Sequence, residues 1–358
     1  MSREFTIAAD DDGIRVDRWF KRHMADVSFN LVSRWARTGQ LRVDGARVGP
    51  GDRLAEGQVL RVPPAETVPV DGAKLAARPV KPRRELSPEE IEFAQGLVIH
   101  KSKHALVINK PPGLATQGGT KTTEHVDGLL DALQFEAESR PKLVHRLDKD
   151  TSGVLLLARS ARAAAYFGKS FATRDTKKLY WAVVAGHPKL DDALIDLPIG
   201  KQPGTGGEKM HVDEEAGLVA KSRFRVIDRA SDKAAFVEMQ PMTGRTHQLR
   251  VHAAATGTPI VGDGKYGGTE AFLTGGVSRK MHLHARRLVL GLPDGGTLDV
   301  KADLPAHFAD TLKMLGFSPE DADLPIAPDK PEGPKPKRRR MSSATSGNRR
   351  GERRSRGK

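Results

Sequence analysis

One segment of the chain brings together side chains that can carry out chemistry. It reads His145-Arg146-Leu147-Asp148-Lys149-Asp150-Thr151-Ser152-Gly153. A carboxylate such as Asp148 or Asp150 can act as nucleophile, general base or electrostatic stabiliser, and neighbouring cations favour its ionised form. The hydroxyls of Thr151 and Ser152 can bond the local backbone, and Gly153 makes no steric demand before the strand that follows. A charged structural turn has the same composition, so the segment alone leaves both interpretations open.

A second segment combines cations with histidines and reads Gly244-Arg245-Thr246-His247-Gln248-Leu249-Arg250-Val251-His252. At helical spacing Arg245, Leu249 and His252 share one face, and Thr246 and Arg250 share another. Such a helix could point Arg245 at a carboxylate near its start.

The histidines of this segment, with His282 and His284, could alternatively bind a metal. The spacing disfavours a metal site, because no carboxylate accompanies the histidines and the chain has no cysteine. We expect His282-Leu283-His284 to alternate across a strand, with both histidines on one side.

Glycine-rich stretches lie at Gly204–Gly207 and Gly262–Gly268. Neither contains a phosphate-binding loop or a convincing dinucleotide-binding fingerprint. We expect turns at both places, and nucleotide-cofactor enzymes are disfavoured.

Both chemical segments fall within one large expected domain, residues 89–325. Strands are predicted at Ala105–Asn109, Val154–Ala158, Tyr180–Ala185 and Leu288–Leu290, and helices at Ala161–Phe171 and Thr246–Thr256. Strands do not alternate regularly with helices. The pattern therefore predicts an α+β fold with a mixed sheet rather than a doubly wound one.

A smaller block, residues 13–63, precedes this domain. Ile14, Val16, Trp19 and Phe20 recur at helical spacing, and a second helical stretch carries Phe29, Leu31, Val32 and Trp35. Short strands are predicted at Leu41–Val43 and Val59–Val62. Many arginines and lysines are interleaved with these elements, and residues 64–88, rich in proline and charge, are predicted to be a linker.

The net charge of +14 is concentrated at the end of the chain, where residues 326–358 contain 12 Lys/Arg and 3 Asp/Glu. This low-complexity tail is predicted to be disordered. A basic tail is typical of proteins that bind nucleic acid, although it could also serve solubility alone.

The absence of cysteine excludes disulfides and thiol chemistry. With no signal-like or membrane-spanning run of apolar residues, we expect a cytoplasmic protein.

The first block resembles the RNA-binding domain named after ribosomal small-subunit protein four. The resemblance rests on Val16-Asp17-Arg18-Trp19 and on the stretch from Ser33 to Gly45. It implies contact with structured RNA, mostly through backbone and shape. Arg18, Arg34, Arg37 and Arg42 are the residues expected to make it.

The large domain resembles the pseudouridine synthases that modify ribosomal and transfer RNA. His145-Arg146-Leu147-Asp148, followed by Thr151-Ser152-Gly153, is similar to the signature of that family. Further motifs agree in order: Asn109–Leu114, Lys178–Ala182, Gly244–His252, Gly262-Asp263 with Tyr266-Gly267, and Leu283–Ala285. The resemblance implies an α+β domain with a mostly antiparallel central sheet.

The resemblance also assigns roles to individual residues. It implies that Asp148 is the catalytic carboxylate, that Arg245 is its charge partner, and that Tyr180 lies against the target base. It implies that Arg146 fills the RNA stack when the uridine flips out, and that Leu249 lines the pocket. Asp150 falls at a variable position of the motif and is expected to be dispensable.

The reaction of this family needs no redox cofactor and no metal, and its partner is RNA, with large-subunit ribosomal RNA expected here. A monomer is the expected state. Two other classes compete with this interpretation. A non-catalytic RNA-binding assembly factor would not need to retain Asp148, and a carboxylate glycoside hydrolase would not need the basic RNA-binding block.

Overall fold

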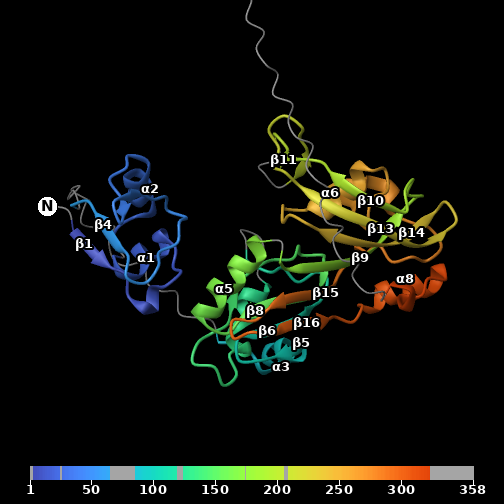
Figure 1. Ribbon diagram of the computed structural model, residues 1–358. Helices are drawn as coiled ribbons and strands as arrows, with labels where there is room; N and C mark the ends of the chain where they lie inside the picture. The colour runs from blue at the N-terminus through green and yellow to red at the C-terminus, as the bar shows by residue number, and fades with distance from the viewer. Residues whose placement is uncertain are drawn as a thin grey trace, which may run out of the picture. The chain divides into compact units, whose positions relative to one another are not determined.

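The computed structural model describes residues 3–24, 26–64, 85–118, 124–173, 175–204 and 209–322 (Figure 1). Most of the expected linker, 64–88, and the whole expected tail, 326–358, lie outside these residues.

The N-terminal part is a pair of helices packed on a small sheet. The helices are α1 (Val16–His23) and α2 (Phe29–Arg37), and the strands are β1 (Arg3–Thr6), β2 (Arg42–Val43), β3 (Ala46–Arg47) and β4 (Val59–Val62), with a 3₁₀ turn, η1 (Ala9–Asp11). The sheet order is β1-β4-β2-β3. The sequence predicted both helices and the strands at β2 and β4, whereas β1 precedes the predicted block and pairs antiparallel with β4.

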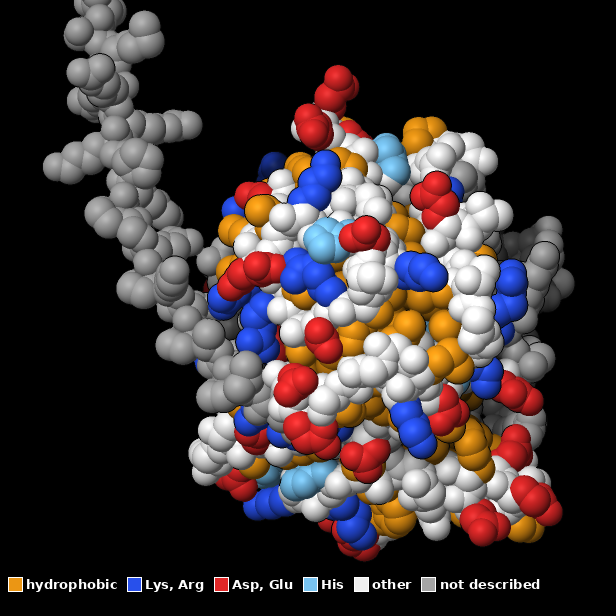
Figure 2. Space-filling view, turned by 90° about the vertical axis from the view of Figure 1, so that its right-hand side faces the viewer, with side chains coloured by type: hydrophobic (Ala, Val, Ile, Leu, Met, Phe, Trp, Pro, Cys, Tyr) orange, Lys and Arg blue, Asp and Glu red, His pale blue; other side chains and the backbone are white. Residues whose placement is uncertain are grey.

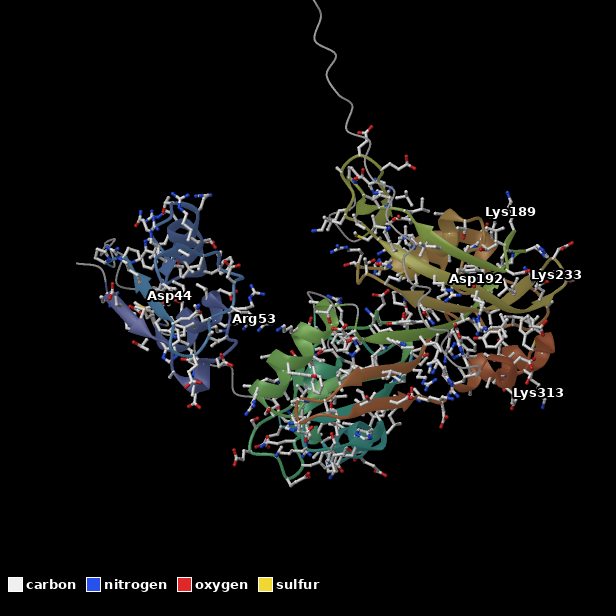
Figure 3. All side chains as sticks on the ribbon, viewed as in Figure 1. Asp44, Arg53, Lys189, Asp192, Lys233 and Lys313 are labelled. Carbon is white, nitrogen blue, oxygen red and sulfur yellow. The ribbon has the colours of Figure 1, made fainter. Side chains whose placement is uncertain are left out.

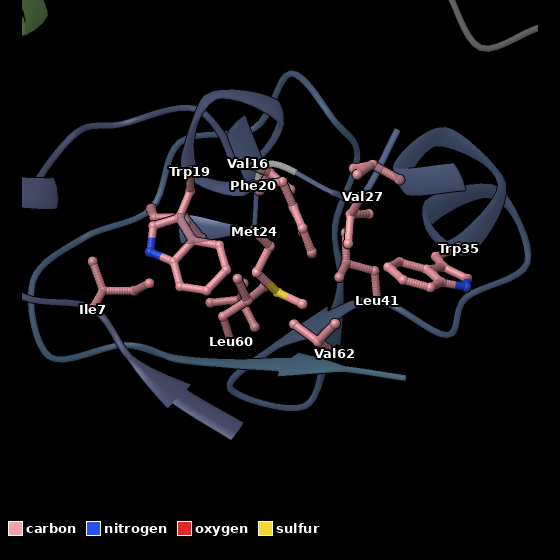
Figure 4. Close-up of a cluster of buried hydrophobic side chains, with 13 residues drawn as sticks. Ile7, Val16, Trp19, Phe20, Met24, Val27, Trp35, Leu41, Leu60 and Val62 are labelled. Atoms are coloured by element: carbon pink, nitrogen blue, oxygen red, sulfur yellow. The ribbon is translucent and has the colours of Figure 1, made fainter. Parts of the chain in front are cut away.

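Three aromatic side chains and a larger number of aliphatic ones form the core of this part (Figure 4). Trp19 and Phe20 of α1 and Trp35 of α2 are all buried, and the rings of Phe20 and Trp35 lie 6.1 Å apart. The apolar stripes of both helices therefore face each other and the sheet, as their spacing predicted. Ser28 caps α2 by accepting the backbone N–H of Leu31 at 3.3 Å.

A tight turn joins β2 to β3 at Asp44-Gly45 (Figure 3 labels Asp44). Both residues have positive φ, 49° for Asp44 and 80° for Gly45, which is the geometry that Asp-Gly pairs favour in hairpins. The Asp44 Oδ1 atom also accepts the backbone N–H of Val59 at 2.9 Å, which ties the turn to β4.

The large domain is built on one extended sheet. Its strands are β5 (Val98–Lys101), β6 (Ala105–Lys110), β7 (Lys142–Leu143), β8 (Ser152–Ala158), β9 (Lys177–Ala185), β10 (Asp192–Asp196), β13 (Lys221–Ala230), β14 (Ala234–Pro241), β15 (Leu283–Gly291) and β16 (Thr297–Lys301). A separate hairpin pairs β11 (Ile199–Lys201) with β12 (Met210–Val212). The helices are α3 (Pro88–Gly96), α4 (Val126–Leu129), α5 (Ala161–Ala172), α6 (Gln248–Ala255), α7 (Gly264–Gly267) and α8 (Ala306–Leu315), with 3₁₀ turns η2 (Leu130–Leu133), η3 (Gly268–Ala271) and η4 (Pro319–Ala322).

The main path of the sheet runs β10-β13-β14-β9-β15-β8-β6-β5. Among its pairs in the described residues, β15 with β8 is parallel and the others are antiparallel. The predicted α+β class with a mixed, mostly antiparallel sheet is confirmed. The predicted strands correspond to β6, β8, β9 and β15, and one predicted helix corresponds to α5.

The sheet has two halves that meet at β15. Around β6 and β8 one core cluster includes residues of α3 and α4, and the other includes residues of α5. Around β9 and β14 one cluster includes residues of α6, and the other includes residues of α8. Tyr180 of β9 packs against a cluster of each half, so it marks the place where the two halves join.

The junction requires a glycine at position 153. Gly153 of β8 lies opposite Ala285 of β15 in the parallel pair and has a φ of 109°. A Cβ atom built on Gly153 would stand 2.2 Å from the Ala285 carbonyl oxygen. No other residue type fits without separating β8 from β15.

The surface shown in Figure 2 carries lysines, arginines, aspartates and glutamates interspersed. This face of the molecule is therefore not dominated by charge of one sign. Among the described helices, none has the length and apolar character needed to cross a membrane.

Candidate active site

Asp148 lies on the loop between β7 and β8, and hydrogen bonds fix the backbone on both sides of it. The buried Thr116 hydroxyl donates to the Leu147 carbonyl at 2.7 Å and accepts the Leu147 N–H at 3.1 Å. On the other side, the Lys149 carbonyl accepts the Gly113 N–H at 2.9 Å. The loop therefore presents Asp148 in a defined position.

A buried ammonium group strengthens this arrangement. The Nζ atom of Lys110, at the end of β6, donates to the carbonyls of Pro111, Leu114 and Lys149 at 2.9, 2.7 and 3.0 Å. Burial lowers the pKa of Lys110 to about 7, against the opposing pull of the Asp150 and Asp148 charges. The sequence placed Lys110 in a motif but did not reveal that it ties two loops together.

Arg250, on α6, is the arginine that contacts Asp148. Its Nη1 atom lies 3.3 Å from Asp148 Oδ2, and its Nε and Nη2 atoms donate to the two carboxylate oxygens of Asp263 at 2.7 and 2.8 Å. Burial alone would lower the pKa of Arg250, but its hydrogen bonds and attraction to Asp263, together with Asp148, raise it overall. Arg250 therefore holds a permanent positive charge at the carboxylate.

The expectation that Arg245 pairs with Asp148 is wrong. The Arg245 Nε atom donates instead to the Val219 carbonyl at 3.0 Å. The reason is that α6 begins at Gln248, two residues later than predicted, so Arg245 belongs to the preceding turn and not to the helix.

The side chain of Gln248 closes this turn. Its Oε1 atom accepts the Thr243 hydroxyl at 2.6 Å and the Arg245 N–H at 3.0 Å, while its Nε2 atom donates to Ser222 Oγ at 2.9 Å. His247 precedes the helix with φ 55° and ψ 19°, a left-handed conformation that is uncommon for residues other than glycine, asparagine, aspartate and histidine. The turn therefore directs the His247 ring toward Asp148, with Nε2 3.7 Å from Asp148 Oδ1.

Two hollows meet at Asp148. The smaller is a pocket of about 290 Å³, lined among others by Tyr180, Leu249 and Leu283. The larger is a groove of about 830 Å³, lined by Asp148, Asp150 and Asp263 and, besides Arg250, by five cations. These cations are Arg146, Lys149, Lys265, Arg279 and Lys280. Asp148, Arg146, His247 and Arg250 border both hollows.

The small pocket offers an aromatic face, a hydroxyl and apolar walls beside the carboxylate. Burial, and then the Asp148 charge, raise the pKa of Tyr180, so its phenol stays protonated at neutral pH. Leu249 is buried at the pocket wall. Such a pocket suits a flat, polar ring held next to Asp148.

His145 has a structural part in this pocket. Its Nε2 atom accepts the Leu156 N–H at 2.8 Å, and its ring stacks on Phe171 at 4.3 Å. Burial, and then the nearby Lys178 charge, lower the pKa of His145 to about 3. The imidazole is therefore neutral and supports the start of the Asp148 loop.

Comparison with known proteins gives a consistent result. A family model described as RNA pseudouridylate synthase matches residues 104–255. Ribosomal large subunit pseudouridine synthase C of Yersinia pestis is 33% identical over 313 residues, which cover 87% of this chain and 94% of that protein. The chain belongs to the RNA pseudouridine synthase family.

Two eukaryotic members of the family agree. Mitochondrial RNA pseudouridine synthase 4 of Arabidopsis thaliana is 35% identical, with 70% of this chain and 59% of that protein covered. The solved structure of human RNA pseudouridylate synthase domain containing 4 matches with a TM-score of 0.54 and 30% identity, over 64% of this chain and 97% of that one. Enzymes of this family are isomerases that act on RNA, and the chain is one of them.

Within the synthase fold, the structure brings together most of the expected site residues. Asp148, Arg146, Tyr180, Arg245 and Leu249 all line the small pocket. The sequence interpretation missed Arg250 as the charge partner, and it missed Asp263, a buried carboxylate in a glycine-rich stretch. The clue available was helical spacing, which already put Arg250 on a different face from Arg245.

The buried histidines His282 and His284 form hydrogen bonds with protein hydroxyl and carbonyl groups. His284 Nδ1 lies 2.9 Å from Ser152 Oγ and its Nε2 lies 3.1 Å from the Ala302 carbonyl. His282 Nε2 lies 2.8 Å from Thr311 Oγ1, and both rings lie beside Phe308, which confirms that they share one side of the strand. Burial lowers the pKa of His282 and of His284 to about 4 in each case.

The arginines expected to contact RNA lie on the surface of the N-terminal part. Arg18 lies on α1, and Arg34 and Arg37 lie one turn apart on α2; all three are exposed. Arg42, on β2, is half-buried and donates to the Gly45 carbonyl at 2.6 Å.

Proposed function

We propose that this synthase converts uridines of large-subunit ribosomal RNA to pseudouridine, with Asp148 as its catalytic carboxylate. The observation that carries this proposal is the position of Asp148, which is held against Arg250 at the mouth of a pocket that contains Tyr180. The RNA target is supported by relatives named for the large ribosomal subunit, of which this chain covers nearly the whole length.

The chemistry requires one bond to break and another to form. The bond between nitrogen one of uracil and the ribose breaks, the base turns, and carbon five bonds to the same sugar carbon. Carbon five loses a proton and nitrogen one gains one, so atoms and electrons balance without a redox cofactor or a metal. Asp148 acts as the carboxylate at the sugar, either by attack on the anomeric carbon or by assisting elimination.

Tyr180 has two features that suit the base. Its ring gives the uracil a face to stack on, and its protonated phenol gives it a hydrogen-bond donor. Leu249 and Leu283 supply an apolar wall that allows the detached base to turn. Arg245 reaches the same pocket from the turn before α6, and we assign it to substrate binding.

The groove fits the strand from which the uridine is taken. A base can enter the pocket only by leaving its stack, which costs a few kcal/mol. The exposed Arg146 borders both hollows and can fill the gap that the base leaves. Lys265, Arg279 and Lys280 place positive charge along the groove, where phosphates would lie.

We assign Arg18, Arg34, Arg37 and Arg42 of the N-terminal part to backbone contacts with structured RNA. We propose that a monomer is the active state. The absence of cysteine suits a cytoplasmic enzyme.

Incubation of the purified protein with unmodified large-subunit ribosomal RNA, followed by chemical mapping of pseudouridine, tests the proposal. We expect modification at defined uridines, and a loss of at least about 1,000-fold in Asp148→Asn. Asp150→Asn is the matched control, because Asp150 is exposed on the same loop, and it should keep activity.

Unmodified small-subunit ribosomal RNA and transfer RNA are assayed in parallel. Activity on one of these RNAs alone would contradict the large-subunit target but would leave the proposed reaction in place. No pseudouridine on any of the three RNAs would contradict the enzymatic proposal, and full activity of Asp148→Asn would contradict the role of Asp148.

A further inference from the structure

A second donor faces Asp148 on the side opposite Arg250. Arg250 Nη1 lies 3.3 Å from Oδ2 of the carboxylate, and His247 Nε2 lies 3.7 Å from Oδ1. The side chains of His247 and Asp148 are 16% and 20% exposed, so the pair lies partly out of water but open to a substrate. The two oxygens of Asp148 therefore have one nitrogen each.

The phenol of Tyr266, on α7, bonds the other ring nitrogen of His247, Nδ1. The Tyr266 Oη atom accepts the Met210 N–H at 3.0 Å and lies 2.7 Å from His247 Nδ1. A backbone N–H can only donate, so the phenolic proton of Tyr266 is free to point at Nδ1. Nδ1 then accepts, and the ring proton stands on Nε2, the atom that faces Asp148.

We propose that His247, held by Tyr266 as the tautomer protonated at Nε2, is a positioning residue that orients the Asp148 carboxylate for the reaction. The inference rests on the proposed role of Asp148. The contacts then form a relay that runs from the backbone of β12 through Tyr266 and His247 to the Asp148 carboxylate.

The groups that face His247 support a neutral ring. Burial lowers its pKa, the charges of Arg250 and Lys265 lower it further, and the charges of Asp148 and Asp263 oppose them. Burial also raises the pKa of Tyr266, so its phenol keeps the proton that it donates. Tyr266 is fixed in turn by Arg250, whose guanidinium lies 5.0 Å from the ring centre.

Two hydrogen-bond donors restrict the rotation of the Asp148 carboxylate more than a single donor does. With Arg250 alone, Asp148 can rotate about the bond to its carboxyl group, and either oxygen can face the ribose. A donor on each oxygen defines the plane of the group in the substrate complex. The distance of 3.7 Å is longer than a hydrogen bond, as is common in sites that tighten only when substrate binds.

The unusual backbone of His247 agrees with this role. A left-handed conformation at a residue other than glycine is strained, and such strain is kept where the surrounding structure needs the side chain in one place. Here it aims the ring between Tyr266 and Asp148.

Steady-state kinetics on the modified RNA test the relay in four proteins: wild type, Tyr266→Phe, His247→Asn and the double variant. Asparagine tolerates the left-handed conformation, and its short amide removes the ring. We expect Tyr266→Phe to lower kcat about five- to tenfold with KM unchanged, and His247→Asn to lower it at least as much. The double variant should be no slower than His247→Asn, because Tyr266 acts through His247.

Tyr166→Phe is the matched control. It removes the same hydroxyl from α5, and it should leave kcat unchanged. Thermal unfolding of each variant confirms that the protein is folded under the assay conditions. Multiplicative effects in the double variant, or wild-type kcat in Tyr266→Phe, would overturn the relay.

A direct measurement of the tautomer is independent of activity. In ¹⁵N spectra of the histidine rings, the signal lost in His247→Asn identifies His247 among the twelve histidines. We expect Nδ1 to be unprotonated and Nε2 to be protonated in wild type, and this preference to weaken in Tyr266→Phe. A proton on Nδ1 in wild type would overturn the proposal. Asp148→Asn separates the two failures. Full activity of Asp148→Asn would contradict the catalytic assignment, whereas an inactive Asp148→Asn together with a proton on Nδ1 of wild-type His247 would contradict the relay alone.

Discussion

Among single residues, the two arginines of the α6 segment offer the sharpest contrast. Arg250 contacts Asp148 and is bound twice by the buried Asp263, whereas Arg245 bonds a backbone carbonyl. We expect Arg250→Ala to lower kcat at least about 100-fold, because the positive charge at the carboxylate is lost. Arg245→Ala should raise KM and keep kcat, because it removes binding that is equal in ground and transition states.

The same pair predicts a difference in stability. Without Arg250, the Asp263 carboxylate stays buried with its charge uncompensated, and we expect a loss of about 3–5 kcal/mol in the free energy of unfolding. Urea titration of both variants measures this difference. Equal stability and equal kcat in Arg245→Ala and Arg250→Ala would contradict the assignment.

The residue types of the site were available from the sequence, but one of the partnerships was not. Motif order singled out Asp148, Tyr180 and the Arg250 segment, because each lies in a short run with recognisable neighbours. The choice between Arg245 and Arg250 depended on where α6 begins. That start is set by Gln248, which bonds Thr243 within the turn and Ser222 on β13. The bond to Ser222 is a tertiary contact that periodicity does not reveal.

Among the elements, the contact between β8 and β15 should be sensitive to one added methyl group. Gly153→Ala would place a Cβ atom 2.2 Å from the Ala285 carbonyl, so one strand must move. We expect a loss of more than about 2 kcal/mol in stability and a large loss of activity, since the Asp148 loop leads directly into β8.

Gly96→Ala, at the end of α3, is the control. Nothing lies within 4 Å of a Cβ atom there, so we expect a change within about 1 kcal/mol. Denaturant unfolding with wild-type stability in Gly153→Ala would show that the junction adapts.

Buried histidines make the large domain sensitive to acid. His282 and His284 have pKa values of about 4, and His145 of about 3, in the folded protein. The unfolded chain binds these protons near the ordinary histidine pKa of about 6.5. Below that pH the unfolded state therefore takes up more protons, and stability falls as pH decreases toward 4. Each histidine contributes up to about 1.4 kcal/mol per pH unit. Urea midpoints measured from pH 7 to pH 4.5 should fall steadily, and a flat profile would contradict the neutral assignment.

The fold class and the central strands could be predicted from the sequence, whereas the exact ends of the elements could not. The apolar runs at β6, β8 and β9 are long and uninterrupted, so their positions followed from pattern alone. The strand β1 was missed because its mostly exposed residues show no core pattern, and it becomes a strand only by pairing with β4.

At the level of the whole molecule, the arginines of the N-terminal part should determine the salt dependence of RNA binding. Replacing Arg18, Arg34 and Arg37 with alanine removes up to three phosphate contacts. The slope of log K against log salt should then decrease by up to about 2, at roughly 0.7 for each contact. Binding measured by filter retention at several salt concentrations tests this.

Three lysines of the large domain provide the control for that experiment. Lys189, Lys233 and Lys313, labelled in Figure 3, are exposed and do not line the groove. Their replacement with alanine removes the same total charge. An equal change of slope in both triple variants would show that overall charge, and not the N-terminal part, governs binding.

The insertion of β15 between β9 and β8 has a consequence for how the enzyme is made. Ser152 and His284, which bond across this junction, are 132 residues apart in the chain. While the ribosome is still synthesising the segment before β15, the two halves of the sheet have no strand to connect them, and the groups around Asp148 cannot assemble. Pairings this distant in sequence form slowly. The nascent protein therefore passes through a stage with two unpaired strand edges, and a chaperone that shields such edges would be expected to increase the yield of active enzyme.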